Sequence, residues 1–295
     1  MTIIVTYACY PVVIQVADRR LTLPDGTLVD DDTTKSVLWD HSWLIGYTGL
    51  ARIQGKPTYQ WIAELLANHH QQLKAGYLDR NLALLGKEIA NALTAERVKP
   101  SCKMLAIVGA GWGVPWDVGE PPPAGLRPYI WHLSNFHDKE GNSTCQIRST
   151  VDFQVARGRP LKKTEMGVLT HGQEMNPMLW SKLCRLLRKA RIRALGPNAP
   201  ARLIVDAVQR MENPRVGKSL LICSLPVPTA QRDQFVLNER PNLARPSFWY
   251  SQPDGEWRVQ RGPIFVDGGN IEEIIEARYG DAVSWPGKVR PDALR

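Results

Sequence analysis

The chain has 295 residues, of which 43% are apolar and 22% are charged, with a formal net charge of +8 at pH 7. These values are ordinary for a globular protein and argue against disorder through roughly residue 225. No apolar run approaches the roughly 20 residues that span a bilayer, and Met1–Val5 lack the features of a signal peptide. The five cysteines are dispersed without zinc-site spacing, which is typical of free thiols in a reducing compartment. We therefore expect a cytoplasmic protein.

The first third of the chain predicts short strands followed by helices. Runs of β-branched and apolar residues predict four strands, at 2–9, 12–22, 35–39 and 43–47. Only Tyr10-Pro11 separates the first two runs, which predicts a hairpin beginning at the second residue of the chain. The polar residues 24–34 are expected to form a loop. Apolar residues at intervals of three and four then predict helices over 58–73 and 79–95.

The next part of the chain repeats this order of strands and then helices. Further strands are predicted at 103–110, 129–134, 146–155, 166–170 and 219–225. Helical periodicity is found over 177–194 and 200–211, and the glycine- and proline-rich residues 111–128 are expected to form a surface loop. Because strands and helices come in separate runs, the sequence favours an α+β fold with sheets packed face to face and helices outside.

Two regions are predicted along the chain. Residues 1–228 are expected to form the folded domain. Residues 229–295 are proline-rich and are expected to be an irregular extension, with one short helix over 271–279, that packs on the domain or on a partner subunit.

A basic segment accounts for much of the positive charge. Its cations alternate with leucines at helical spacing, and they are Lys182, Arg185, Arg188, Lys189, Arg191 and Arg193. We interpret the segment as an amphipathic helix with a solvated basic face, and expect neither nucleic acid nor membrane as a partner. A nucleic-acid-binding module is the alternative, and it predicts binding that weakens steeply with salt.

Thr2 is the first candidate for chemistry. Removal of Met1 leaves a hydroxyl and a free α-amine on one residue, so that a nucleophile and its base lie together. An α-amine has an ordinary pKa of roughly 7.7–8.0, close to the pH at which a general base is most useful. Many proteins begin with Met-Thr, so the case for Thr2 depends on its neighbours.

Three features support a site around Thr2. Asp18 directly follows a buried apolar run, where an unpaired charge is costly, so it needs a partner. Lys35 opens the third strand, and a lysine beside a hydroxyl and an amine lowers the pKa of both. Gly49 ends the fourth strand, where a glycine lets backbone N–H groups point at a developing oxyanion. We expect Asp18 to orient Lys35, and Lys35 to activate Thr2.

Four stretches combine these residues: Thr2-Ile3-Ile4-Val5, Val12-Val13-Ile14 followed by Asp18, Lys35, and Gly46-Tyr47-Thr48-Gly49. In type and spacing they resemble the proteasome β-subunits and their bacterial relatives HslV and Anbu, which are N-terminal nucleophile hydrolases. The resemblance covers roughly residues 2–225. It implies a four-layer αββα sandwich, a threonine peptidase or amide hydrolase, and no metal or organic cofactor. The catalytic roles would fall on Thr2 as nucleophile, on Asp18 and Lys35, and on Gly49 as the oxyanion N–H donor.

The resemblance also implies substrate contacts and assembly. Leu21, Tyr47 and Ala51 match the positions that line the family's substrate pocket, and they would favour an apolar or small side chain. Family members form rings or open spirals, so a homo-oligomer acting on a peptide or protein substrate is expected. An ATP-dependent unfoldase could feed it.

The later part of the chain departs from the family pattern. A Gly-Ser-Gly and an Asp-x-x-Ser-Gly of the family correspond here to His171-Gly172-Gln173 and to residues 212–217, without the serines. Gly172, Glu212 and Asn213 are therefore the candidates for secondary support of the site. Two functions stay open: a threonine peptidase, and a catalytically inactive structural subunit with the same fold. A lone histidine near a strand end, such as His171, is expected to be structural.

Overall fold

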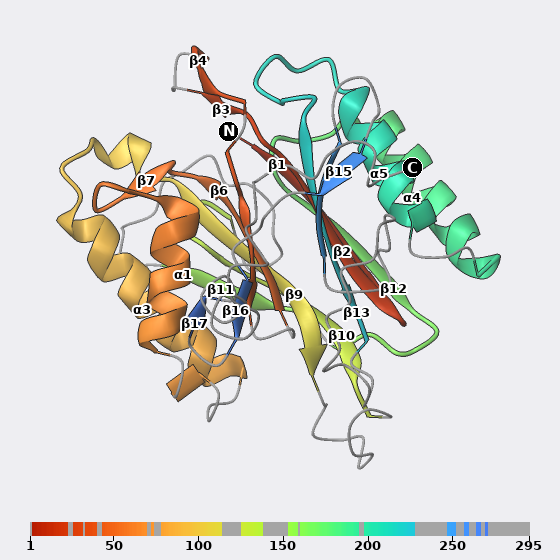
Figure 1. Ribbon diagram of the computed structural model, residues 1–295, viewed down its shortest axis with the longest axis horizontal. Helices are drawn as coiled ribbons and strands as arrows, with labels where there is room; N and C mark the ends of the chain where they lie inside the picture. Colours follow the sequence, from red (N-terminus) through yellow and green to blue (C-terminus); the bar gives the residue numbers. More distant parts are fainter. Residues whose placement is uncertain are drawn as a thin grey trace, which may run out of the picture.

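A computed structural model describes residues 2–22, 26–31, 33–39, 43–69, 72–73, 78–113, 125–137, 153–158, 160–194 and 198–227, together with the backbone of 247–251, 257–259, 264–266 and 269–270. The described residues form an α+β protein with two large, mainly antiparallel sheets and four α-helices. Figure 1 shows one pair of helices on either side of the strands.

The first sheet contains the N-terminal hairpin and has the strand order β12-β1-β2-β13-β14-β15. Its strands are β12 (Met166–Gly172), β1 (Ile3–Cys9), β2 (Val12–Asp18), β13 (Leu220–Pro226), β14 (Ser247–Ser251) and β15 (Trp257–Val259). All of its neighbouring strands are antiparallel. The predicted hairpin is confirmed, with Ile4 opposite Ala17 and Cys9 opposite Val12. Residue 2 therefore lies at the open end of this hairpin, beside Asp18.

The second sheet has the order β11-β10-β9-β6-β5-β16-β17. Its strands are β11 (Gln154–Arg157), β10 (Arg127–Ser134), β9 (Leu105–Gly113), β6 (Trp43–Gly49), β5 (Ser36–Trp39), β16 (Ile264–Val266) and β17 (Gly269–Asn270). Only the pairing of β16 with β5 is parallel among the described strands of this sheet. Two short ribbons lie outside the sheets, β3 (Leu21–Thr22) with β4 (Leu28–Asp30) and β7 (Arg52–Ile53) with β8 (Lys56–Pro57).

Each large sheet carries two helices. The helices are α1 (Thr58–Asn68), α3 (Leu78–Ala95), α4 (Pro177–Ile192) and α5 (Asn198–Gln209), and a short 3₁₀ turn spans Pro100–Cys102. The start of α4 is fixed locally, because the side chain of Asn176 accepts a hydrogen bond from the backbone N–H of Met178 at 2.9 Å and Pro177 occupies the first turn.

Three buried apolar clusters hold these elements together. One joins α4 and α5 to β1, β2 and β13, and a second joins α1 and α3 to β5, β6 and β9. The third draws its buried side chains from strands of both sheets and includes Ala8, Val13, Leu44, Ala110 and Leu221. Every residue of β1 and β2 is buried, which explains their almost continuous apolar sequence. Each buried Val, Leu or Ile contributes roughly 1.5–3 kcal/mol.

The loop predicted over residues 111–128 is wrong at both ends. β9 continues to Gly113, and β10 begins at Arg127, which is paired with Gly113. Gly113, one of the glycines that suggested a loop, instead makes room for an aromatic ring of β10, because a Cβ on it would lie 2.9 Å from the ring of Tyr129. Gly109, in the part of β9 that was predicted as a strand, does the same for Trp131, whose ring would lie 2.0 Å from its Cβ.

Other boundaries also differ from the prediction. The polar stretch 24–34 contains the exposed strand β4, and α1 ends at Asn68, before the predicted residue 73. Most of the strand predicted at 146–155 and the helix predicted at 271–279 lie outside the described residues. The described parts of 229–295 are strands that extend both sheets, because an edge strand offers unpaired backbone groups to a following segment. The division into residues 1–228 and 229–295 stays a prediction.

Candidate active site

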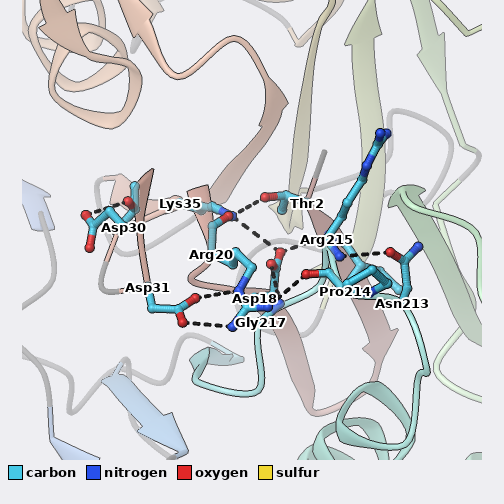
Figure 2. Close-up of polar contacts among 12 residues, drawn as sticks. Thr2, Asp18, Arg20, Asp30, Asp31, Lys35, Asn213, Pro214, Arg215 and Gly217 are labelled. Atoms are coloured by element: carbon cyan, nitrogen blue, oxygen red, sulfur yellow. Dashed lines mark hydrogen bonds and ion pairs between the residues drawn. The ribbon is translucent and has the colours of Figure 1, made fainter. Parts of the chain in front are cut away.

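Lys35 and Thr2 meet between the two sheets. The side-chain Nζ of Lys35 donates a hydrogen bond to Oγ1 of Thr2, as Figure 2 shows. Thr2 directly precedes β1 of the first sheet, and Lys35 directly precedes β5 of the second. Thr2 is 5% exposed and Lys35 is 2% exposed. A contact predicted from two distant segments of the sequence is therefore present, in an environment nearly closed to solvent.

Asp18 lies behind this pair at the end of β2 and is fully buried. Its Oδ1 accepts hydrogen bonds from Nζ of Lys35 at 3.4 Å and from the backbone N–H of Ile3 at 3.0 Å. Its Oδ2 accepts from the backbone N–H of Gly217 at 3.0 Å. These three donors satisfy a carboxylate that would otherwise be costly to bury. Asp18 thus connects the start of β1, the ammonium of Lys35 and the segment before β13.

The environment of Lys35 lowers the pKa of its side-chain amine. Burial lowers the pKa of Lys35 below its ordinary value, and the nearby charge of Arg19 lowers it further, whereas Asp18 opposes the shift. Burial is the largest of these effects, because removing an ammonium from water disfavours the charged state. An amine with a lowered pKa exchanges protons closer to neutral pH, which suits it to chemistry on the adjacent hydroxyl.

Arg20 connects this buried pair to the surface. Its backbone carbonyl accepts a further hydrogen bond from Nζ of Lys35. Its guanidinium forms two parallel bonds to Asp31, at 2.7 and 2.8 Å, and donates to the carbonyl of Pro214 at 2.8 Å. The hydrogen bond from Arg20 lowers the pKa of Asp31. As Figure 2 shows, Arg20 therefore links the segment after β4 to the segment before β13 around Lys35.

The backbone of Thr2 is held by residues of both sheets. Its carbonyl oxygen accepts a hydrogen bond from the backbone N–H of Gln173, after β12, at 2.9 Å. The same oxygen accepts from the hydroxyl of Thr48, in β6, at 3.3 Å. The side chain of Gln173 in turn accepts from Nδ2 of Asn213 at 2.9 Å. Gly172, predicted as secondary support, lies directly against the Thr2 carbonyl.

Gly49 lies at the end of β6, immediately after Thr48. Its φ is +110°, and a Cβ at this position would lie 2.1 Å from the carbonyl oxygen of Met104. Both the backbone conformation and the close approach of β9 therefore require a glycine here. Gly49, the predicted oxyanion donor, therefore comes directly after Thr48, whose hydroxyl contacts Thr2.

The predicted substrate-binding residues differ in their surroundings. Tyr47 is 3% exposed and packs in the apolar cluster beneath α1 and α3, and its hydroxyl donates to the carbonyl of Thr34 at 3.3 Å. Successive residues of a strand point to opposite faces, so Tyr47 faces this cluster whereas Thr48 faces Thr2, and the pocket role of Tyr47 stays a prediction. Leu21 and Ala51 are partly buried, in β3 and after β6 respectively.

The two candidates for secondary support before β13 differ in placement. Glu212 is exposed, whereas Asn213 is partly buried. Asn213 donates to Gln173, and its Oδ1 accepts from the backbone N–H of Arg215 at 2.9 Å. Asn213 is therefore the one of the two that belongs to the network around Thr2.

Sequence reasoning missed Arg20, Thr48 and Gln173 as contacts of the site. Thr48 had a usable signal, since the two-residue period of a strand separates its face from that of Tyr47. The position of Arg20, two residues after Asp18, was a weaker signal. Gln173 had none, because it acts on Thr2 mainly through its backbone N–H.

Other kinds of site are not evident in the described part of the chain. Within it, no group of three His, Cys, Asp or Glu side chains is arranged to hold a metal ion. None of the helices described there has the length and apolar character needed to cross a membrane. A cavity of about 300 Å³ lies along α1 and α3, and none of the predicted site residues lines it.

Neither the known protein families nor the curated proteins suggest a function for this chain, so its function is inferred from the geometry of the site. The chain matches no model of a known protein family, and no curated protein is similar enough to count as a relative.

Proposed function

We propose that this protein is a threonine-type peptidase or amide hydrolase of the proteasome-like, N-terminal nucleophile type. The single observation that carries the proposal is the contact of the Lys35 ammonium with the Thr2 hydroxyl. A merely solvated chain terminus would not bury its hydroxyl against a cation that is itself bonded to a buried carboxylate. Thr2, Lys35 and Asp18 are each at most 5% exposed. Buried groups that hydrogen-bond to one another in this way, one of them a lysine whose pKa is lowered, are typical of sites that perform chemistry.

The proposed reaction begins once Met1 has been removed. Oγ1 of Thr2 bonds to the carbonyl carbon of the substrate while its proton passes to the α-amine of the same residue. Lys35 lowers the pKa of both groups, and Asp18 orients Lys35. The carbonyl electron pair moves to oxygen, where the N–H of Gly49 stabilises the oxyanion. Collapse of this intermediate breaks the C–N bond, and the leaving amine takes the proton from the α-ammonium. Water then hydrolyses the ester on Thr2.

The proposed fold is the four-layer αββα sandwich of these hydrolases, formed by residues 1–228. The proposal is supported by the pairing of α1 and α3 with one sheet and of α4 and α5 with the other. It is also supported by the apolar cluster shared by strands of both sheets. A homo-oligomeric ring or open spiral, a peptide or protein substrate and an ATP-dependent unfoldase as partner are proposed from the resemblance alone.

Covalent labelling with a β-lactone probe tests the proposed nucleophile. The wild type, Thr2→Ala and a control, Thr94→Ala on α3, are compared after removal of Met1 has been verified by intact mass. We expect the wild type and the control to carry the adduct on residue 2, and Thr2→Ala to carry none. Equal labelling of Thr2→Ala would refute the proposal.

A non-catalytic structural subunit is the second candidate, and it is favoured by a specific observation. The two stretches that correspond to the family's serine motifs lack the serines, and Gln173 and Asn213 from these stretches instead form an amide pair. The intact mass of the protein from its native host separates the two functions. Retention of Met1 would leave Thr2 without a free amine and would favour the structural role, whereas a mass lacking Met1 would favour the peptidase.

A further inference from the structure

Three of the six histidines of the chain meet in one buried cluster. His171 comes from β12 of the first sheet, His132 from β10 of the second, and His137 from the segment after β10. The ring centroid of His171 lies 5.2 Å from that of His132 and 5.6 Å from that of His137. The centroids of His132 and His137 are 6.0 Å apart. Each of the three is at most 5% exposed. The cluster therefore bridges the two sheets.

The hydrogen bonds of the cluster are consistent with neutral imidazoles. Nε2 of His171 lies 3.4 Å from Nδ1 of His132, so one ring donates to the other. Nδ1 of His137 lies 2.8 Å from Oγ of Ser134, and this oxygen already accepts from the backbone N–H groups of Phe136 and His137. The hydroxyl proton of Ser134 is therefore available to His137, which makes its Nδ1 an acceptor. Nδ1 of His171 has no hydrogen-bond partner among the described residues.

The surroundings of His171 oppose a proton on its ring. The titratable groups that act on it are His132 from β10 and His137 from the segment after it, and each disfavours a second positive charge. From the neighbouring β1, the residue opposite His171 is the apolar Ile4. Burial is the largest effect and, with the two other histidines, it lowers the pKa of His171 to about 3. The ordinary value for histidine is roughly 6.5.

The sign of the pH dependence follows from this difference. Because the pKa of His171 is lower in the folded than in the unfolded chain, the unfolded chain binds more protons between these two values. The stabilising effect of the neutral ring is complete above about pH 6.5 and is lost as the pH falls toward about 3. Over this interval each pH unit reduces the folding equilibrium constant by up to about tenfold.

His171 is also adjacent in sequence to the residues that hold Thr2. The next residue, Gly172, touches the Thr2 carbonyl, and the N–H of Gln173 donates to it at 2.9 Å. Movement of the His171 ring out of the space between the sheets would therefore shift both contacts. We propose that the cluster of His132, His137 and His171 is an acid-sensitive device that positions Thr2, with the neutral cluster fixing the end of β12 and protonation of His171 releasing it. His171 acts as a positioning residue, and this inference rests on the proposed function for the role of Thr2.

Hydrogen exchange of the Gln173 amide tests the proposal without any need for activity. The protection factor of this amide is measured between pH 7 and 5 in full-length Thr2→Ala and in the same background with His171→Gln. Glutamine keeps an amide that can bond to His132 but does not titrate. His69→Gln, which changes a histidine at the end of α1, is the matched control. We expect protection to fall with pH in Thr2→Ala and in the His69→Gln control, and to stay constant with His171→Gln.

Identical protection profiles with and without His171→Gln would overturn the proposal. If His171→Gln does not fold, proton NMR of the histidine rings in the unaltered chain tests the proposal instead. We expect one histidine ring to remain neutral from pH 8 to 5. Titration of all six histidines near the ordinary value would overturn the proposal. The β-lactone labelling of Thr2 is then followed over the same pH range. Loss of labelling at every pH, with an intact exchange result, would refute the proposed function and leave the positioning role standing.

Discussion

A Cβ atom on Gly172 would lie 1.8 Å from the carbonyl oxygen of Thr2, much closer than two non-bonded atoms approach. Gly172 also has a φ of +88°, a conformation that residues with side chains rarely adopt. Two independent constraints therefore require a glycine at the end of β12. The position of Thr2 depends on the backbone of this segment as well as on Lys35 and Asp18.

Gly172→Ala should consequently displace Thr2. We expect Thr2 labelling by a β-lactone probe to fall by at least tenfold, and the melting temperature to fall by several degrees, corresponding to roughly 1–3 kcal/mol for overpacking. Gly55→Ala is the matched control, because Gly55 has a φ of +76° but nothing within 4 Å of its Cβ position. It should lower stability through backbone strain alone and leave labelling unchanged. Equal labelling of the two variants would contradict this account.

Lys35→Met should separate the chemical role of the ammonium from its packing. Methionine has a similar length but cannot act on the hydroxyl of Thr2, so we expect labelling to fall by roughly 10²- to 10⁴-fold. The variant leaves Asp18 buried without its cation, which should cost about 3–5 kcal/mol of stability. Combining it with Asp18→Asn should restore part of the stability measured by urea unfolding, but none of the labelling. Recovery of labelling in the double variant would exclude a chemical role for Lys35, and Lys99→Met serves as an exposed control.

The ion pair of Arg20 and Asp31 predicts a modest pH effect. Its side chains are 24% and 44% exposed, so Asp31→Asn should lower stability by only about 0.5–1 kcal/mol at pH 7. The pKa of Asp31 is lowered in the folded chain, so its contribution is present above the ordinary value of roughly 3.9 and is lost as the pH falls through the folded value. Urea unfolding at neutral and acidic pH should show the difference from wild type shrinking below about pH 4. Asp206→Asn, on the exposed face of α5, should show no such difference at either pH.

The sequence predicted the contacts that depend on a few strong local signals. The apolar runs of β1 and β2 placed Thr2 beside Asp18, because a short hairpin fixes the register of its two strands. Lys35 was a candidate from its residue type and its place at the start of a strand, but its contact with Thr2 joins two different sheets, so the resemblance to a family was needed to support it. The fold class was predictable from the order of strands and helices, whereas the glycines of β9 misled the prediction of a loop.

Other contacts between residues of separate strands and segments could not be predicted from the sequence. The cluster of His132, His137 and His171 comes from separate elements, and no spacing rule connects residues that meet through sheet packing. The strands β14 and β16 pair with β13 and β5, and the residue pattern of one segment does not show with which other strand it pairs. Tyr47 was assigned to a pocket from the resemblance, although the alternation of β6 directs it to the apolar cluster beneath α1 and α3.

The two neighbouring residues Tyr47 and Thr48 should therefore respond differently to loss of a hydroxyl. Tyr47→Phe removes a hydrogen bond to the carbonyl of Thr34 and should cost roughly 0.5–1.5 kcal/mol, without changing Thr2 labelling. Thr48→Val removes the hydroxyl that donates to the Thr2 carbonyl, and it should slow labelling at a comparable cost in stability. Labelling rates are measured with two β-lactones that differ in the size of their apolar side chain, together with melting temperatures. A change in the preference between the two probes in Tyr47→Phe, but not in Thr48→Val, would show that Tyr47 lines the substrate pocket despite its burial in the apolar cluster.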